Sequence, residues 1–173
     1  MNTAIISYSL TGNNCALAES LAKKTNAKHI EVKTVKKFGM GTLIMDIMFK
    51  RAPKVTPAPS VLDEYDSIIF MGPLWMGQAA TPLRRYFAYL KGSGKKYSFI
   101  SVCGGAKGGN QNLQEQFIQR IGHAPENLLE LHTSNLVDES VKEDIKATTD
   151  YKLTGADVED FTLRALEAMA PMS

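Results

Sequence analysis

Hydrophobic residues cluster in five short runs that predict the β-strands of a sheet. The runs are rich in β-branched and aromatic residues and are short for helices. The run Ser67–Met71 is almost continuously apolar, as in a strand covered by helices on both faces, whereas His29–Val35 alternates, as in a strand nearer the edge of a sheet. The five predicted strands lie at residues 4–8, 29–35, 67–71, 96–103 and 128–136.

Between these strands, apolar residues recur every three to four positions, which predicts helices packed against the sheet. Thr81 followed by Pro82 marks the start of one helix, and Thr154 with Asp157 has the spacing of a capping box at the start of another. Because strands and helices alternate, the sequence predicts an α/β fold with a parallel sheet, in a single domain over residues 1–173. The predicted helices lie at residues 14–25, 40–48, 81–90, 112–121 and 154–169.

The predicted helix at residues 40–48 carries an apolar stripe formed by Met40, Leu43, Ile44, Ile47 and Met48. Lysines and an arginine flank it on both sides, so the helix could lie on a membrane surface or on a partner. We expect it instead to cover one face of the sheet, as a doubly wound fold requires. The proline-rich residues 54–60 then form an extended connector, and the polar residues 138–152 have no assigned role.

The composition is that of a soluble globular protein, with 44% hydrophobic and 22% charged residues among 173. We expect neither a transmembrane segment nor a signal peptide, because no apolar run is long enough and Met1 leads directly into a strand. Cys15 and Cys103 are far apart and form no CxxC pair, which favours the reducing cytoplasm over a disulfide framework or a metal site. A net charge of +2 without a long basic run argues against nucleic-acid binding.

The loop after the first predicted strand has the features of a phosphate site. A turn between a strand and a helix directs the free N–H groups and the positive end of the helix dipole at a ligand, and Gly12 adds no side chain to obstruct it. The loop lacks the lysine of a nucleoside-triphosphate loop and the glycine spacing of a dinucleotide loop, so it suits a single phosphate monoester. The alternative is an ordinary N-cap turn. The loop residues are Ser9, Leu10, Thr11, Gly12, Asn13 and Asn14.

Two further loops follow the third and fourth predicted strands. The loop at residues 72–77 has the sequence GPLWMG and contains Trp75, the only tryptophan of the chain. The loop at residues 104–110 has the sequence GGAKGGN, and its four glycines would let the backbone approach a flat ligand and offer N–H donors to it. Core packing for Trp75 and a flexible surface loop at 104–110 remain the alternatives.

These loops resemble those of the flavodoxin family. Ser9, Thr11 and Gly12 match its phosphate loop, [ST]-x-T-G-x-[TS], with Asn14 in place of the last hydroxyl. Residues 71–77 resemble its G-x-P-x-[WY]-x-G loop, with Met71 in place of the first glycine. The resemblance implies a doubly wound five-stranded sheet of order 2-1-3-4-5 with helices on both faces, in which the three loops meet at the carboxyl edge. A CheY-like receiver would need an acidic cluster after the first strand, and the chain has none there.

The resemblance also implies FMN as the cofactor. Trp75 would stack on one face of its ring, and Lys107 would place a positive charge beside the pyrimidine edge. The flavin carries the redox chemistry, so we assign no catalytic residue and no metal, and none of the three histidines a role. A helix N-terminus would lower the pKa of Cys15, although we assign neither cysteine to catalysis. The implied cofactor-binding residues are Ser9, Leu10, Thr11, Gly12, Asn13, Asn14, Pro73, Leu74, Trp75, Met76, Gly77, Cys103, Gly104, Gly105, Ala106, Lys107 and Gly109.

Two functions are compatible with such a site. The first is an FMN oxidoreductase that takes electrons from NAD(P)H and passes them to a quinone or another small acceptor; the alternative is a flavodoxin-type carrier between redox proteins. We favour the enzyme, since shuttle flavodoxins are usually strongly acidic and enclose the flavin between two aromatic residues. This chain is slightly basic, and residues 104–110 contain no aromatic residue. A scaffold without a cofactor is a third interpretation, and the sequence leaves open whether the chain forms a homodimer.

Overall fold

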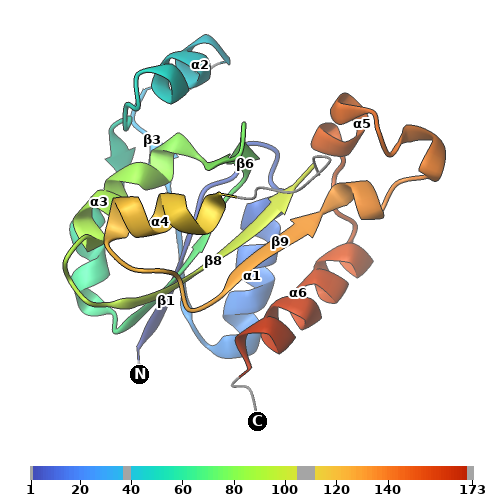
Figure 1. The fold of residues 1–173 in the computed structure, drawn as a ribbon. Coiled ribbons are helices and arrows are strands. Elements are labelled where there is room, and N and C mark those ends of the chain that lie inside the picture. Colours follow the sequence, from blue (N-terminus) through green and yellow to red (C-terminus); the bar gives the residue numbers. More distant parts are fainter. Residues whose placement is uncertain (1, 37–39, 105–111, 171–173) are drawn as a thin grey trace.

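Five parallel strands form the centre of the protein in a computed structural model that describes residues 2–36, 40–104 and 112–170 (Figure 1). The order of the strands across the sheet is β2-β1-β5-β8-β9, which confirms the predicted 2-1-3-4-5 order of a doubly wound sheet. Their bounds are Thr3–Ser7 for β1, Lys28–Glu31 for β2, Ser67–Met71 for β5, Lys96–Cys103 for β8 and Leu128–His132 for β9.

Helices cover both faces of this sheet, also as predicted. On one face lie α1 (Asn13–Thr25) and α6 (Gly155–Met169), and on the other lie α3 (Arg84–Leu90) and α4 (Leu113–Ile121). Because side chains alternate along a strand, β1, β5, β8 and β9 contribute to both cores. Thr154 caps α6 through the predicted capping box with Asp157.

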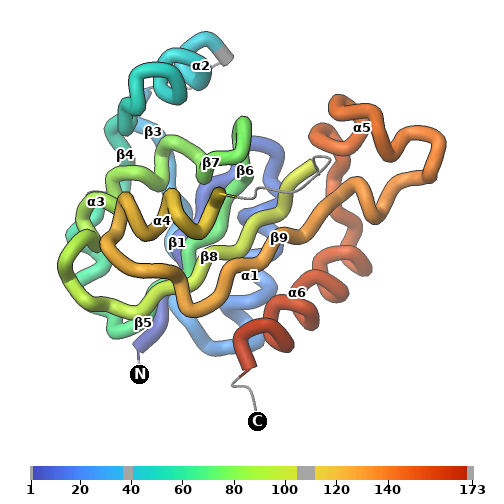
Figure 2. Tube along the Cα trace, in the orientation of Figure 1, coloured from blue at the N-terminus to red at the C-terminus, as the bar shows by residue number. Residues whose placement is uncertain are grey.

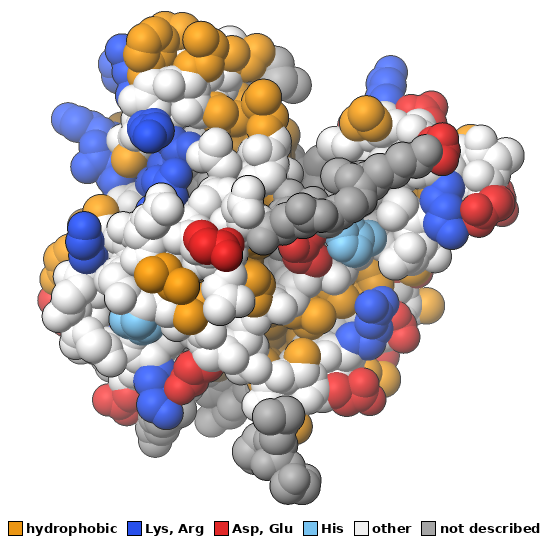
Figure 3. Space-filling model, in the orientation of Figure 1, with side chains coloured by type: hydrophobic (Ala, Val, Ile, Leu, Met, Phe, Trp, Pro, Cys, Tyr) orange, Lys and Arg blue, Asp and Glu red, His pale blue; other side chains and the backbone are white. Residues whose placement is uncertain are grey.

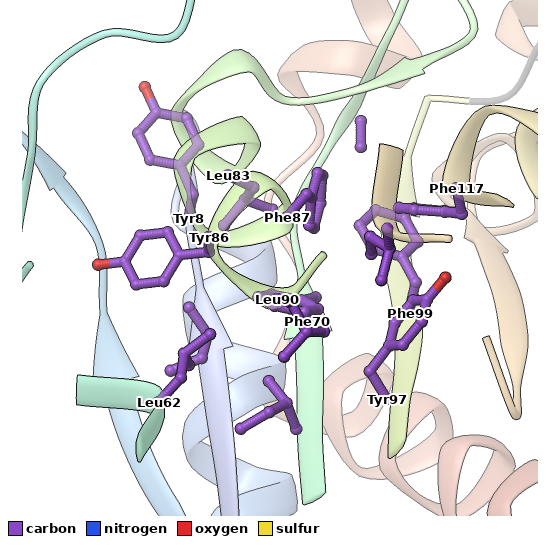
Figure 4. Close-up of a cluster of buried hydrophobic side chains, with 14 of the residues drawn as sticks. Tyr8, Leu62, Phe70, Leu83, Tyr86, Phe87, Leu90, Tyr97, Phe99 and Phe117 are labelled. Atoms are coloured by element: carbon purple, nitrogen blue, oxygen red, sulfur yellow. The ribbon is translucent and has the colours of Figure 1, made fainter. Parts of the chain in front are cut away.

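The core between the sheet and the helices α3 and α4 is rich in aromatic side chains (Figure 4). Phe70 of β5 meets Phe87 of α3 edge to face, with ring centroids 4.9 Å apart, and Phe99 of β8 lies 4.8 Å from Phe117 of α4. Large rings at such positions bury much apolar area and prefer edge-to-face or offset geometry. They fix the two helices against the sheet.

Two of the predicted strands are shorter in the structure. The strand predicted at residues 29–35 ends in the central sheet at Glu31, and residues 33–34 form β3 (Lys33–Thr34), which pairs antiparallel with β4 (Val55–Thr56) outside the sheet. The strand predicted to reach Leu136 ends at His132, where a 3-10 turn, Thr133–Asn135, begins. The polar residues 138–152 include a further 3-10 turn, Glu139–Val141, and α5 (Ile145–Asp150), whose first N–H groups are capped by Asp144.

The prediction that residues 40–48 cover the sheet is wrong. They form a helix, α2 (Met40–Met48), but it stands beyond the carboxyl edge of the sheet (Figure 1), and Ile44 and Met48 are 49% and 68% exposed. The 3-10 segment Pro59–Glu64 takes the expected place on the sheet, because its Leu62 is buried in the aromatic core. Periodicity identified the helix but could not show which segment would fill the core.

A buried arginine attaches α2 to the body of the protein. The guanidinium of Arg84 donates to the backbone carbonyls of Asp46 and Arg51 at 2.8 and 2.9 Å and to Oε1 of Gln78 at 2.9 Å. Burial, with the neighbouring Arg120, lowers the pKa of Arg84 to about 10, against the opposing effect of Asp46. Arg84 therefore remains charged at neutral pH, and charge-assisted hydrogen bonds of this kind are stronger than neutral ones.

Within the described parts of the chain, no helix has both the length and the apolar character needed to cross a membrane.

Candidate functional site

A hollow opens at the carboxyl edge of the sheet, where β1, β5 and β8 end. Its volume is about 80 Å³. Enclosed small-molecule pockets measure about 300–1,000 Å³, so a larger ligand would extend over the open side. Residues from all three predicted loops line it, together with threonines from two other segments: Leu10, Thr11, Asn13, Asn14, Pro73, Leu74, Trp75, Val102, Cys103, Gly104, Thr133, Thr148 and Thr149.

The first loop turns sharply into the start of α1. Gly12 is the N-cap residue of α1 and has a φ of 99°, in the left-handed region that favours glycine. The hydroxyl of Ser9 accepts a hydrogen bond from the N–H of Gly12 at 2.9 Å, which closes the turn. The first N–H groups of a helix have no partner within it, so this turn directs donors and the positive dipole end toward the edge of the sheet.

The side chains of Asn13 and Asn14 hold the loop in place. Asn14 is 2% exposed, and its amide pairs with Val102 of β8 in both directions: Nδ2 donates to the Val102 carbonyl and Oδ1 accepts from the Val102 N–H, both at 2.9 Å. Asn13 donates to the carbonyl of Tyr151 at 2.7 Å and accepts from the N–H of Leu153 at 3.1 Å. Both amides form hydrogen bonds with the protein's own backbone. A phosphate bound at this loop would therefore accept hydrogen bonds from backbone N–H groups and hydroxyls.

Lys152 is a residue of this site that sequence reasoning missed. Its ammonium group donates to the backbone carbonyl of Thr11, which places a cation beside the first loop. Thr148 and Thr149, from the same part of the chain, line the hollow. Lys152 lies in a polar segment without a motif, about 140 residues from the first loop, and no local pattern in the sequence indicated the contact.

The second loop forms a hairpin of β6 (Leu74–Trp75) and β7 (Gln78–Ala79). Its turn residues Met76 and Gly77 have φ values of 50° and 73°, and Met76 is 81% exposed at the tip. Trp75 borders the hollow and packs edge to face on Tyr8, with ring centroids 5.8 Å apart. Burial raises the pKa of Tyr8 to about 12, so it stays protonated near neutral pH. The hairpin therefore holds an aromatic ring beside the first loop.

The third loop begins at Cys103 and Gly104, and both line the hollow. A Cβ at Gly104 would lie 3.0 Å from Oγ1 of Thr149 and 3.3 Å from Oγ1 of Thr148, so glycine permits the close approach of the segment that carries α5. Gly105, Ala106, Lys107 and Gly109 lie outside the described residues. The expectation that they contact a ligand stays a prediction.

The expectation for Cys15 is wrong in direction. Burial raises the pKa of its thiol, and the nearby carboxylates of Glu31 and Glu19 raise it further. A hydrogen bond with Ser7 opposes these effects without reversing the direction of the pKa shift.

Cys103 belongs to a cluster with two residues of β9. Its Sγ lies 3.4 Å from Nδ1 of His132, and Nε2 of His132 lies 3.7 Å from a carboxylate oxygen of Glu130. The cluster arises because Cys103 and His132 are opposite each other in the β8–β9 register, which no local pattern in the sequence indicates. The ligand atoms of the three residues lie within 4.8 Å of one another and could hold a metal ion, so the expectation of no metal stays a prediction.

The strand order and the convergence of loops at the switch point define a doubly wound α/β protein with the flavodoxin-like fold. A flavoprotein from Lactobacillus acidophilus NCFM, crystallised in complex with FMN, has a TM-score of 0.61 and 18% identity over 84% of this chain and 98% of its own. A putative flavoprotein from Bacteroides eggerthii has a TM-score of 0.64 and 13% identity over 88% of this chain and 100% of its own.

Oxidised flavodoxin 1 from Bacillus cereus has a TM-score of 0.55 and 17% identity over the full length of both chains. At sequence identities of 13–18%, the structural similarity establishes the shared fold alone. No protein-family model and no curated protein matches the sequence.

Replacing Asn14 by Ala should lower the free energy of unfolding. The substitution leaves the buried N–H and carbonyl of Val102 without their partner, at about 1–3 kcal/mol for each group. Urea denaturation should show a loss of about 2–6 kcal/mol. Asn112→Ala is the matched control, since Asn112 is exposed and its side chain does not cap α4. Equal stability of the two variants would contradict the role of Asn14.

Proposed function

We propose that the chain binds FMN at this hollow and is an oxidoreductase that passes electrons from NAD(P)H to a quinone or another small acceptor. One observation carries the proposal: the start of α1, Trp75 and Gly104 border the same hollow at the switch point of the sheet. The FMN complex of the structurally similar flavoprotein from Lactobacillus acidophilus supports the choice of cofactor.

The residues around the hollow fit the two ends of such a cofactor. The first N–H groups of α1, the hydroxyls of Ser9 and Thr11 and the ammonium of Lys152 would hold the phosphate. Trp75 would cover one face of the ring, and Gly104 gives the backbone a close approach. When bound, FMN supplies the redox chemistry of the isoalloxazine ring.

The protein's part in the reaction is to bind and orient. Two anchors make the site rigid: the pairing of Asn14 with Val102 fixes the phosphate end, and the hairpin fixes Trp75 against Tyr8. A site held by packing and hydrogen bonds positions a ligand with little loss of entropy on binding. Residues 104–110 contain no aromatic residue, so the ring face opposite Trp75 would have room for a nicotinamide or an acceptor. This openness favours an enzyme over a carrier.

Lys152→Gln should weaken FMN binding about three- to tenfold, because a cation about 4 Å from a phosphate contributes roughly 1 kcal/mol in water and more where water is partly excluded. Riboflavin lacks the phosphate, so its affinity should not change. Fluorescence titrations of both ligands at low and high salt measure the difference. Lys142→Gln is the control, because Lys142 pairs with Glu139 on the surface. An equal loss for both ligands would show that Lys152 does not contact the phosphate.

Anaerobic addition of NADH or NADPH to the FMN-loaded protein tests the proposed activity. We expect the visible flavin absorbance to bleach at a rate that supports turnover, and a quinone added afterwards to restore it. A flavin that binds but does not respond to either nicotinamide would overturn the enzyme and favour the carrier. A protein that binds no flavin would overturn both.

A further inference from the structure

The helix α2 exposes several of its apolar residues to solvent. Three of them, together with Phe49 directly after the helix, form what we call the α2 surface: Ile44, Met45, Met48 and Phe49 are 49%, 43%, 68% and 58% exposed. They occupy positions i, i+1, i+4 and i+5, so they share one side of the helix. Figure 3 shows hydrophobic side chains gathered over α2 at the upper left of the molecule. Contiguous exposed apolar side chains of this kind mark an interaction site.

A surface helix usually turns its apolar side chains toward the protein and its charged side chains toward water. α2 does the reverse. Its one charged residue, Asp46, is 5% exposed and faces the body of the protein, whereas the apolar side chains of the α2 surface face outward. Arg84 stabilises this orientation through its hydrogen bonds to the carbonyls of Asp46 and Arg51. Because these hydrogen bonds of a buried arginine fix the helix in this orientation, the fold itself holds the apolar face outward.

Positive charge lies beside this surface. Residues 33–60 contain six Lys and Arg residues and one acidic residue, Asp46, which is buried. Lys50, Arg51 and Lys54 directly follow α2 and are exposed, and the guanidinium of Arg51 lies 5.3 Å from the ring of Phe49. Lys and Arg side chains lie beside the hydrophobic group in Figure 3. An apolar centre with a cationic border complements a surface that has an apolar interior and anionic groups above it.

We propose that the α2 surface docks the protein onto an anionic lipid bilayer. Its four apolar side chains enter the boundary between headgroups and acyl chains, while Lys50, Arg51 and Lys54 contact the anionic headgroups. A second copy of the chain is a poorer occupant, because a two-fold contact through this surface would bring the same cations together. α2 stands beyond the carboxyl edge of the sheet (Figure 1), and the hollow opens at the same edge. Docking would therefore bring this edge toward the membrane.

Co-sedimentation of the purified protein with lipid vesicles tests the proposal. We expect binding to vesicles of phosphatidylcholine mixed with phosphatidylglycerol, much weaker binding to phosphatidylcholine alone, and a decrease with added salt. Lys50→Gln/Lys54→Gln should lower the affinity about 25-fold, at roughly fivefold for each cation removed. Ile44→Gln/Met48→Gln should lower it at least about tenfold, because two side chains can no longer enter the apolar layer.

Matched controls come from other surfaces of the molecule. Ile118→Gln/Leu163→Gln changes two exposed apolar residues of α4 and α6, and Lys28→Gln/Lys91→Gln changes two exposed lysines. Both should bind vesicles like the parent, and circular dichroism should show every variant folded. No binding to anionic vesicles, or equal binding by all variants, would overturn the proposal.

Size-exclusion chromatography tests whether a second copy of the chain occupies the α2 surface instead of lipid. A dimer that Ile44→Gln/Met48→Gln dissociates would assign the α2 surface to a second copy and overturn lipid docking. These readouts do not depend on flavin chemistry, so their failure would leave the proposed function unaffected.

Discussion

The pairing of Asn14 with Val102 is the contact on which the candidate site depends. It joins the start of α1 to β8 across the intervening strand β5, and so sets where the first N–H groups of the helix point. Both atoms of the Asn14 amide take part, and the residue is buried, so it has a structural role in a loop where the sequence suggested a ligand contact. Any anion bound there would meet backbone donors held in place by this pair, with Lys152 beside them.

Two segments outside the central sheet shape the surroundings of the hollow. The segment with α5 is fixed by the hydroxyl of Thr133, which donates to the carbonyl of Thr148 at 2.5 Å, and by its close approach to Gly104. The segment with α2 is fixed by Arg84. Both lie beyond the carboxyl edge (Figure 2), where loops of doubly wound folds carry function. One brings Lys152 to the first loop, and the other carries the α2 surface.

The strand order and the helix-covered faces could be predicted because apolar runs and helical periodicity record which residues are buried. The turn into α1 could be predicted because Gly12 and Ser9 act locally. The role of Asn14, the cation of Lys152 and the cluster at Cys103 could not, since each depends on partners brought close by the fold, such as Val102. The position of α2 was predicted wrongly for a related reason. Its apolar stripe is real, but the buried Leu62 of another segment occupies the core position that the stripe was expected to fill.

We propose that one hollow holds the phosphate of FMN at the start of α1 and the ring against Trp75. Because Trp75 is the only tryptophan of the chain, its fluorescence reports on this place alone. Titration with FMN should quench most of the emission and saturate at one FMN per chain, and riboflavin at equal concentrations should quench far less. Emission that FMN leaves unchanged, or that riboflavin quenches equally well, would contradict the account.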